Sequence, residues 1–270
     1  MAINTPLMNV MTTAARKAGK AIMRDFGEVE NLQISRKGPA DFVTKVDLKA
    51  EKVVKEELIR TRPHYSFVME ESGVVEGPDK THRWFIDPLD GTTNFLHGVP
   101  HFAVSIALER EGQLVAGVVY NPVTDDLFVA EKGRGAWLND RRLRVSARRN
   151  LKEALVATGI PYHGREGHQA FSNELSLVMK DVAGVRRFGA AALDLAWVAA
   201  GRYDAFWERG LGPWDVAAGT VIVREAGGIV SDLAQGQNML TEGHVLASNG
   251  HLHGPMLKVL KGARTSSSAA

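Results

Sequence analysis

Residues 84–95 read WFIDPLDGTTNF, and this stretch decides how the rest of the chain is interpreted. The apolar residues at its start predict a buried strand, and two carboxylates three residues apart, Asp87 and Asp90, stand at the end of that strand. Pro88 fixes the backbone between them, and Gly91 permits a tight turn. Such a turn leaves backbone N–H groups free, and free N–H groups bind phosphate well. The stretch therefore predicts two acids beside a phosphate-binding turn.

Two further segments carry acids that the fold would bring to the same place. Glu70 ends the preceding apolar run, and adjacent strands that end side by side would place it near Asp87 and Asp90. Asp215 lies just inside a predicted helix. Carboxylate and carbonyl oxygens prefer magnesium or manganese over zinc. Together with the backbone carbonyl of Leu89, these acids would suit two or three Mg²⁺ ions, with Mn²⁺ as a substitute.

Each of these acids also has a simpler structural explanation. An Asp and a Gly near the end of a strand commonly form an ordinary turn. An acid in the first turn of a helix, as at Asp215, is favoured by the helix dipole, and Asp47 is placed to cap a second helix. The occurrence of all these acids in one chain is what favours a metal site. We expect Asp90 to face solvent in that site.

A pair of divalent ions has a defined use in phosphate chemistry. One ion lowers the pKa of the attacking water, and the other stabilises the leaving oxygen of an in-line displacement. A hydroxyl paired with a carboxylate could orient that water, and Thr92 with Asp47 is the natural pair. The residues thus indicate metal-dependent hydrolysis of a phosphate ester.

Composition argues against several other classes of protein. The 270 residues include 33 Lys and Arg against 31 Asp and Glu, and the net charge of +2 gives no electrostatic case for broad binding to nucleic acids or membranes. The chain has no cysteine, which removes disulfides, thiolate metal sites and cysteine nucleophiles. No apolar run approaches the roughly 18–20 residues of a membrane span, and the N-terminus lacks a secretory signal. We therefore expect a cytoplasmic protein that binds no membrane.

Motifs of other enzyme classes are also missing from the sequence. It has neither the G-x-S-x-G elbow of serine hydrolases nor the Walker loop of nucleotide hydrolases. His97 and His101 have the spacing of a helical metal pair, but Gly98 and Pro100 lie between them and argue against a helix. A packing or loop role is the default for these two histidines.

Hydrophobic periodicity predicts helices and strands that alternate irregularly, which is typical of a mixed α/β fold built in layers. We expect helices over residues 7–26, 47–62, 171–182, 190–200, 213–226 and 255–261. We expect strands over residues 66–69, 83–86, 102–108, 114–120, 127–130, 203–207, 229–231 and 244–247. One compact unit over residues 1–270 is expected, with residues 263–270 as a disordered tail.

Two signatures in the chain resemble those of the inositol monophosphatase family. Residues 87–95, followed by residues 97–102, are similar to the first signature, and residues 214–219 with 225–228 are similar to the second. The resemblance spans residues 7–260 and is closest to the bacterial extragenic-suppressor type. Smaller similarities are a loop at Lys37–Gly38, a helix start at residues 41–47, acids at Glu70–Glu71 and a hairpin at residues 135–139.

This resemblance implies a layered αβαβα sandwich, a homodimer, and lithium-sensitive, Mg²⁺-dependent hydrolysis of myo-inositol monophosphate to inositol and phosphate. By position, it implies metal ligands at Glu70, Asp87, Asp90 and Asp215, and at Leu89 through its carbonyl. It implies water activation by Asp47 and Thr92, with Glu70 among the catalytic residues. It implies substrate binding by Asp90, Gly91, Thr92, Gly189, Ala190, Ala191, Glu208 and Asp215.

One departure from the family pattern bears on the substrate. Many relatives carry Ser or Thr where this chain has Ala190, so one hydrogen bond to the substrate is missing here. Relatives with almost the same metal motif act on histidinol phosphate, fructose 1,6-bisphosphate or phosphoadenosine phosphate, and these substrates stay open as alternatives. The resemblance also raises a role in transcription complexes, additional to catalysis, for which the arginines within residues 141–149 are the one sequence feature.

Overall fold

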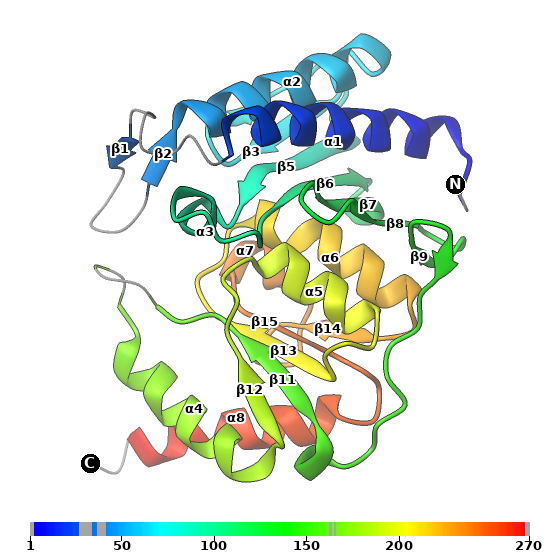
Figure 1. The fold of residues 1–270 in the computed structure, drawn as a ribbon. Helices are drawn as coiled ribbons and strands as arrows, with labels where there is room; N and C mark the ends of the chain where they lie inside the picture. The colour runs from blue at the N-terminus through cyan, green and yellow to red at the C-terminus, as the bar shows by residue number, and fades with distance from the viewer. Residues whose placement is uncertain (1–2, 27–33, 37–41, 162–163, 165, 268–270) are drawn as a thin grey trace.

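The chain folds into five alternating layers of helix and sheet (Figure 1). This computed structural model describes residues 3–26, 34–36, 42–161, 164 and 166–267. From one side to the other, the layers are the pair α1 and α2, an eight-stranded sheet, the pair α5 and α6, a five-stranded sheet, and the pair α4 and α8. The expected αβαβα order is therefore confirmed.

The two sheets differ in how their strands are paired. The large sheet has the order β10-β9-β8-β7-β6-β5-β3-β4 and is antiparallel except where β3 pairs with β5. The small sheet has the order β12-β11-β13-β15-β14, with parallel pairs on both sides of β11. The strands of the large sheet are β3 (Ser66–Met69), β4 (Gly73–Val75), β5 (His82–Asp90), β6 (Ala103–Arg110), β7 (Gln113–Asn121), β8 (Asp126–Glu131), β9 (Ala136–Leu138) and β10 (Arg141–Arg142). Those of the small sheet are β11 (Leu155–Thr158), β12 (Gly184–Arg186), β13 (Ala205–Glu208), β14 (Ile229–Ser231) and β15 (Val245–Ser248).

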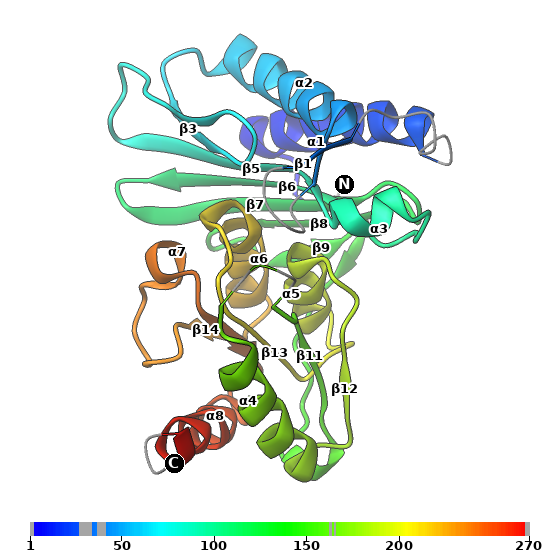
Figure 2. The same cartoon turned by 90° about the vertical axis from the view of Figure 1, so that its left-hand side faces the viewer.

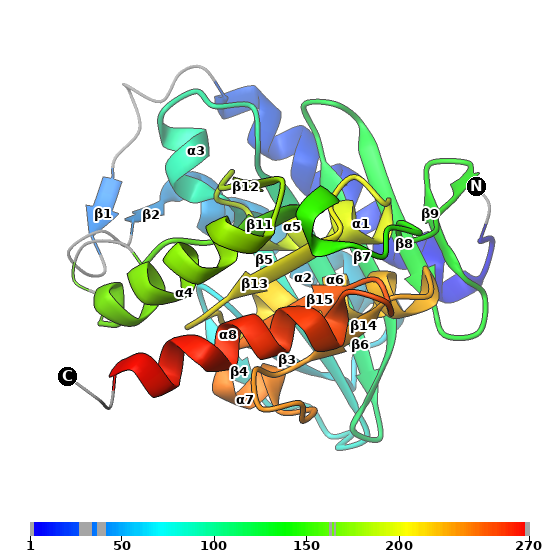
Figure 3. The ribbon, with the colours of Figure 1, turned by 90° about the horizontal axis from the view of Figure 1, so that it is seen from below.

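The helices provide three layers and several connections. Figure 3 shows α4 and α8 side by side across the small sheet, at the face seen from below. The long helices are α1 (Pro6–Asp25), α2 (Lys45–Thr61), α4 (His168–Asp181), α5 (Ala191–Ala199), α6 (Pro213–Glu225) and α8 (His253–Ser267). Shorter elements are α3 (Thr92–Leu96), α7 (Met239–Glu242), a 3₁₀ turn (Leu151–Glu153) and the small pair β1 (Ile34–Arg36) and β2 (Phe42–Thr44).

The first helix illustrates how local sequence defines these elements. Thr5 Oγ1 accepts a hydrogen bond from the Met8 N–H at 3.1 Å, and Pro6 occupies the first helical position, where its missing N–H is not needed. Apolar residues at helical spacing, including Met8, Met11 and Ile22, are fully buried. Figure 2 shows the result, with α1 and α2 lying across β5, β6 and β7 of the large sheet.

Some expected bounds were wrong, and several strands were not expected. α2 begins at Lys45, so Asp47 lies in its first turn instead of capping it. α8 runs to Ser267, beyond the expected end at residue 261, and Ala263 is only 3% exposed, so the predicted tail begins too early. Strands β4, β10, β11 and β12 are two to four residues long, too short to give a periodic signal. The predicted loop at Lys37–Gly38 and residues 268–270 lie outside the described residues.

α6 forms the centre of the molecule, between the two sheets. Residues 216–223 of this helix are all buried, which explains why the segment is apolar on every side. Small residues let its neighbours approach closely: Gly117 of β7 lies against the backbone of Ala218, and Gly219 lies against Leu195 of α5. The acid at the first turn of α6 is therefore held in place by dense packing behind it.

Replacing Gly117 by Ala is expected to destabilise the fold. A β-carbon at this position would lie 2.5 Å from the carbonyl oxygen of Ala218 and 3.0 Å from its Cα. Because the obstacle is helix backbone, β7 and α6 must separate, and overpacking of this kind costs about 1–3 kcal/mol. Urea unfolding measures the loss, with Gly254→Ala as the control because a β-carbon there meets nothing within 4 Å. An unchanged urea midpoint in Gly117→Ala would contradict this account of the packing.

Candidate active site

The parallel pairing of β3 and β5 brings the first two acids together. Met69 lies opposite Ile86 in the register, and the Glu70 N–H donates to the Ile86 carbonyl at 3.1 Å. The next residue of β5 is Asp87, whose side chain is hydrogen-bonded to that of Glu70. Side-by-side strand ends were the expected route to this contact, and the structure confirms it.

Three aspartates from two distant segments form the centre of the site. Each of Asp87, Asp90 and Asp215 offers a carboxylate oxygen, and these oxygens all lie within 4.8 Å of one another. Asp87 and Asp90 come from the end of β5, where the register to β6 shifts between the two residues. Asp215 comes from the first turn of α6. The arrangement could hold a metal ion.

Each aspartate is fixed by a backbone N–H group on one of its two oxygens. The Leu89 N–H donates to Asp87 Oδ1 at 2.9 Å, and the Ala192 N–H, at the start of α5, donates to Asp90 Oδ2 at 2.8 Å. The Gly212 N–H donates to Asp215 Oδ2 at 2.7 Å, so Asp215 does stabilise its helix end, as the simpler explanation proposed. A carboxylate oxygen has more than one lone pair, so an oxygen that accepts a hydrogen bond can also bind a metal ion.

The electrostatics of the cluster are unfavourable without a cation. Burial, and then the charge of Asp215, raises the pKa of Asp90 to about 7. Burial raises the pKa of Asp87 and of Glu70 well above the usual range, with further contributions from the charge of Glu70 on Asp87 and of Asp215 on Glu70. Asp90 is 9% exposed, so the expectation that it faces solvent was wrong. This cluster, with Asp87 and Asp90 buried and Asp215 half-buried, is the kind of donor set that a hard divalent cation prefers.

The predicted water-activating residues lie beside this cluster. Asp47 is 1% exposed, and its charge contributes to raising the pKa of Glu70. Thr92 Oγ1 donates to the carbonyl of Leu89 at 3.0 Å. That carbonyl has a second lone pair, so it can still serve as the predicted metal ligand. The pairing of Thr92 with Asp47 stays a prediction.

Glu51 holds the turn that follows Glu70, a role that no sequence pattern predicted. Its carboxylate, 2% exposed, accepts from the Glu71 N–H at 2.9 Å, from the Ser72 N–H at 3.3 Å and from the Ser72 hydroxyl. Glu51 lies one helical turn after Asp47 on α2, so one helix face positions two parts of the site. A lone glutamate inside an amphipathic helix gives no sequence signal for this role.

Replacing Glu51 by Gln is expected to lower the affinity of the site for its metal more than it lowers the stability of the fold. Loss of the charge weakens three hydrogen bonds to the turn after Glu70, and partners that orient metal ligands typically contribute 10- to 100-fold in metal affinity. We expect the Mg²⁺ concentration for half-maximal phosphatase activity to rise about tenfold. The control is Glu56→Gln on the exposed side of α2. Equal Mg²⁺ dependence in the two variants would argue against a positioning role.

A cavity of about 280 Å³ opens beside Asp90 and Asp215. Most of the substrate residues expected from the sequence line it: Asp90, Gly91, Thr92, Gly189, Ala191, Glu208 and Asp215. Ala190 is different, because it is 1% exposed and packs against Gly91 behind the cavity wall. The missing hydroxyl at this position therefore lies behind the wall and not on the cavity surface.

Other cavity residues were not found in the sequence analysis. They are Thr93, Asn94, Gly159, Ile160, Arg187 and Leu211. Asn94 connects two loops of the site, since its Nδ2 donates to the carbonyls of His101 and Phe188 at 2.7 Å each. Asn94 stands inside the first signature, but its role depends on a segment 94 residues away, which no local pattern indicates.

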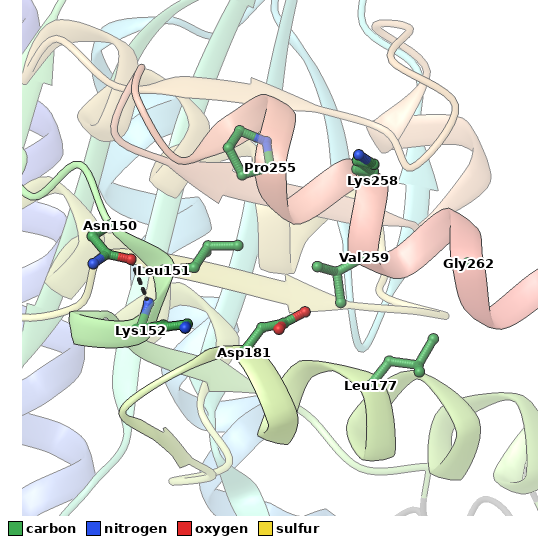
Figure 4. A pocket seen from close by; sticks show the side chains of 9 residues that line it. All are labelled: Asn150, Leu151, Lys152, Leu177, Asp181, Pro255, Lys258, Val259 and Gly262. Atoms are coloured by element: carbon green, nitrogen blue, oxygen red, sulfur yellow. Dashed lines mark hydrogen bonds between the residues drawn. The ribbon is translucent and has the colours of Figure 1, made fainter.

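A larger hollow lies elsewhere on the molecule (Figure 4). It has a volume of about 460 Å³ and lies between α4, α8 and the 3₁₀ turn. Leu151, Leu177 and Val259 contribute apolar side chains, and Asp181 is the one carboxylate among the lining residues. A single acid does not make a divalent metal site, so the smaller cavity is the candidate active site.

The layers and the carboxylate cluster define the class of protein: a layered α/β protein with an acidic cluster that could hold a metal ion beside a cavity. The chain belongs to the inositol monophosphatase family, whose sequence model matches residues 3–265. The inositol-1-monophosphatase of Mesorhizobium japonicum is 58% identical over 255 residues, covering 94% of this chain and 96% of that protein. The Nus factor SuhB of Escherichia coli is 46% identical over 244 residues, covering 90% of this chain and 91% of that protein.

Solved structures show the same fold. The extragenic suppressor protein suhB from Bartonella henselae has a TM-score of 0.93 and 55% sequence identity, covering 95% of this chain and 99% of that chain. The family and the fold expected from the two signatures are thus confirmed. None of the helices within the described ranges has the length and apolar character needed to cross a membrane.

Proposed function

We propose that this protein is a Mg²⁺-dependent phosphatase that hydrolyses myo-inositol monophosphate to inositol and phosphate. The observation that carries the proposal is the cluster of Asp87, Asp90 and Asp215, two of which, Asp90 and Asp215, line a cavity that Glu208 also lines. The name of the 58% identical relative, inositol-1-monophosphatase, supports the choice of substrate. The proposal includes a cytoplasmic homodimer.

In this proposal, one group of residues binds the metal ions and another binds the water and the phosphate. Glu70, Asp87, Asp90, Asp215 and the Leu89 carbonyl would hold the ions. Bound Mg²⁺ would supply charge neutralisation of the phosphate and acidification of the attacking water. Asp47 and Thr92 would orient that water and accept its proton. The backbone N–H groups after Gly91 would bind the phosphate oxygens, because Gly91, Thr92 and Thr93 line the cavity at the start of α3.

Glu208 would select a substrate with hydroxyl groups. It lies at the end of β13, half-buried, in the cavity that contains Asp90 and Asp215. A carboxylate accepts hydrogen bonds and donates none when ionised, so it favours a polyol over an apolar leaving group.

Phosphate release from a panel of esters tests the proposed function. The panel holds inositol 1-phosphate, histidinol phosphate, fructose 1,6-bisphosphate and phosphoadenosine phosphate, each with Mg²⁺, with a chelator, and with Mg²⁺ and Li⁺. We expect Mg²⁺-dependent, Li⁺-inhibited release that is fastest from inositol 1-phosphate. Preference for another ester would mean that the proposed substrate is wrong. Release without Mg²⁺ would overturn the metal mechanism.

A second candidate function is binding to the transcription machinery. The name of the 46% identical relative, Nus factor SuhB, raises it, and Arg141 of β10 and Arg149, which precedes the 3₁₀ turn, have exposed side chains. Two other arginines of this region are already engaged, Arg148 with Asp204 at 3.1 Å and Arg142 over the ring of Trp137. Exchanging Arg141 and Arg149 for Glu should abolish association with RNA polymerase complexes and leave phosphatase turnover intact. Unchanged association would remove this surface from consideration.

A further inference from the structure

The cavity contains a glycine, Gly159, whose lack of a side chain affects the position of a neighbouring acid. Thr158 of β11 lies opposite Trp207 of β13 in a parallel pair, so the following residues, Gly159 and Glu208, leave the sheet side by side. Both line the candidate active site. The two strand ends therefore place a residue without a side chain next to the acid that would select the substrate.

The carboxylate of Glu208 occupies the space that a side chain on Gly159 would fill. A β-carbon built on Gly159 would overlap Oε1, Oε2 and Cδ of Glu208. The backbone of Gly159 is not in the left-handed region, so its conformation does not by itself require glycine. The requirement comes from the position of the neighbouring carboxylate.

The backbones on both sides of this contact are fixed. The Thr158 hydroxyl, in a residue 1% exposed, donates to the Gly159 carbonyl at 3.1 Å. Glu208 pairs with Val245 of β15 and follows Trp207, which is fully buried. The next residue, Arg209, pairs with the buried Glu174 of α4, with Nε 2.9 Å from Oε1. Because both strand ends are held by these contacts and the atoms met are the far end of a flexible side chain, we expect an added methyl group to displace the Glu208 side chain.

We propose that Gly159 is a specificity-determining residue that keeps the Glu208 carboxylate against the end of β11, where its oxygens meet the hydroxyl groups of a polyol phosphate. This inference rests on the proposed function and deepens it. Gly159 contributes no contact of its own to the ester phosphate, so its effect is on the choice of alcohol and not on the cleavage of the phosphate bond.

Substituting Gly159 by Ala tests the proposal through a ratio of two substrates. The measured quantity is kcat/KM for inositol 1-phosphate divided by kcat/KM for phenyl phosphate, whose leaving group has no hydroxyl for Glu208 to bind. We expect the ratio to fall about tenfold or more in Gly159→Ala, mainly through KM, because a hydrogen bond to a charged group is lost. The control Gly254→Ala should keep the wild-type ratio, since its β-carbon meets nothing within 4 Å.

A double variant distinguishes displacement of Glu208 from any effect of Gly159→Ala that does not act through Glu208. Glu208→Ala alone should lower the ratio, and adding Gly159→Ala to it should lower the ratio no further, because the displaced group is already gone. The double variant should also be at least as stable as Gly159→Ala, since the overlap is removed. Thermal unfolding checks that each variant is folded.

The outcomes distinguish this inference from the proposed function. If the wild-type protein prefers inositol 1-phosphate and Gly159→Ala keeps that preference, the role of Gly159 is wrong and the proposed function stands. If the two substitutions lower the ratio independently, Gly159 acts other than through Glu208 and the inference is wrong. If the wild-type protein shows no preference for the polyol ester, both are wrong.

Discussion

Asp90→Asn is expected to remove nearly all phosphatase activity while making the metal-free protein more stable. Asp90 is one of three aspartates whose oxygens lie within 4.8 Å, and replacing its charge removes a ligand from the proposed metal site. Metal catalysis supplies several kcal/mol of stabilisation, so we expect kcat/KM to fall by about 1,000-fold or more.

The opposite effect on stability has a separate physical cause. In the metal-free protein, the charge of Asp90 is buried and faces Asp215, which is why its pKa is raised to about 7. A neutral amide removes that repulsion. The Ala192 N–H, which donates to Asp90 Oδ2 at 2.8 Å, can still donate to the amide oxygen of Asn.

Two measurements on one variant test this pair of effects. Steady-state kinetics in Mg²⁺ give the loss of activity, and thermal unfolding with a chelator at pH 8 gives the change in stability. Asp181→Asn, an exposed acid in the hollow of Figure 4, is the matched control and should change neither quantity. Substantial turnover in Asp90→Asn would contradict the metal site, and a lower unfolding temperature would contradict the repulsion.

The second large effect is a pH dependence of the stabilisation by Mg²⁺. The pKa of Asp90 is raised from 3.8 to about 7, and those of Asp87 and Glu70 are raised well above their usual values. A raised pKa means that the folded protein binds protons more tightly than the unfolded chain. In the metal-free protein, these groups therefore add their full contribution to the free energy of unfolding below about pH 4. That contribution is lost as the pH rises toward 7 and beyond.

Bound Mg²⁺ should reverse this trend. Ions neutralise the ionised carboxylates, so the rise in unfolding temperature caused by Mg²⁺ should be small at pH 5, where protons compete, and about 5 °C or more at pH 8. The histidines act in the other direction: burial lowers the pKa of His101 to about 4 and lowers that of His253, so stability is lost as the pH falls below 6.5. The difference between unfolding temperatures with and without Mg²⁺ cancels this histidine effect.

Differential scanning fluorimetry from pH 5 to pH 8, with saturating Mg²⁺ or with a chelator, measures that difference. Asp90→Asn should reduce its pH dependence, because one of the titrating ligands is gone. A stabilisation by Mg²⁺ that is equal at pH 5 and pH 8 would show that the clustered carboxylates do not bind the ion.

Much of the site could be predicted from sequence because its chemistry is local in the chain. The apolar run before Asp87, the turn at Gly91 and the acid inside the helix at Asp215 each follow from residue type and short spacing. Glu70 could be added because apolar strands in such folds commonly end at one edge. The bounds of β3 at Ser66–Met69 agreed with the expected strand.

Contacts between distant segments could not be predicted in this way. Asp90 and Ala192 are 102 residues apart, and Asn94 and Phe188 are 94 apart, yet each pair shares a hydrogen bond in the site. In the sequence, Glu51 has the pattern of any polar residue of an amphipathic helix. Its role follows only from its hydrogen bond with the turn after Glu70. Such contacts depend on how whole layers pack, which one sequence does not encode in any local pattern.

The sequence by itself determined the set of oxygen donors, the turn at Gly91 and the layered α/β class, because side-chain type and the periods of helix and strand act over a few residues. Only the tertiary structure decided that Ala190 lies behind the cavity wall, that Asp90 is buried, and that Gly159 leaves room for Glu208. The physical reason is that burial and steric exclusion arise between segments brought together by packing. Two strands of the small sheet, from different parts of the chain, must end side by side before an absent side chain can position a carboxylate.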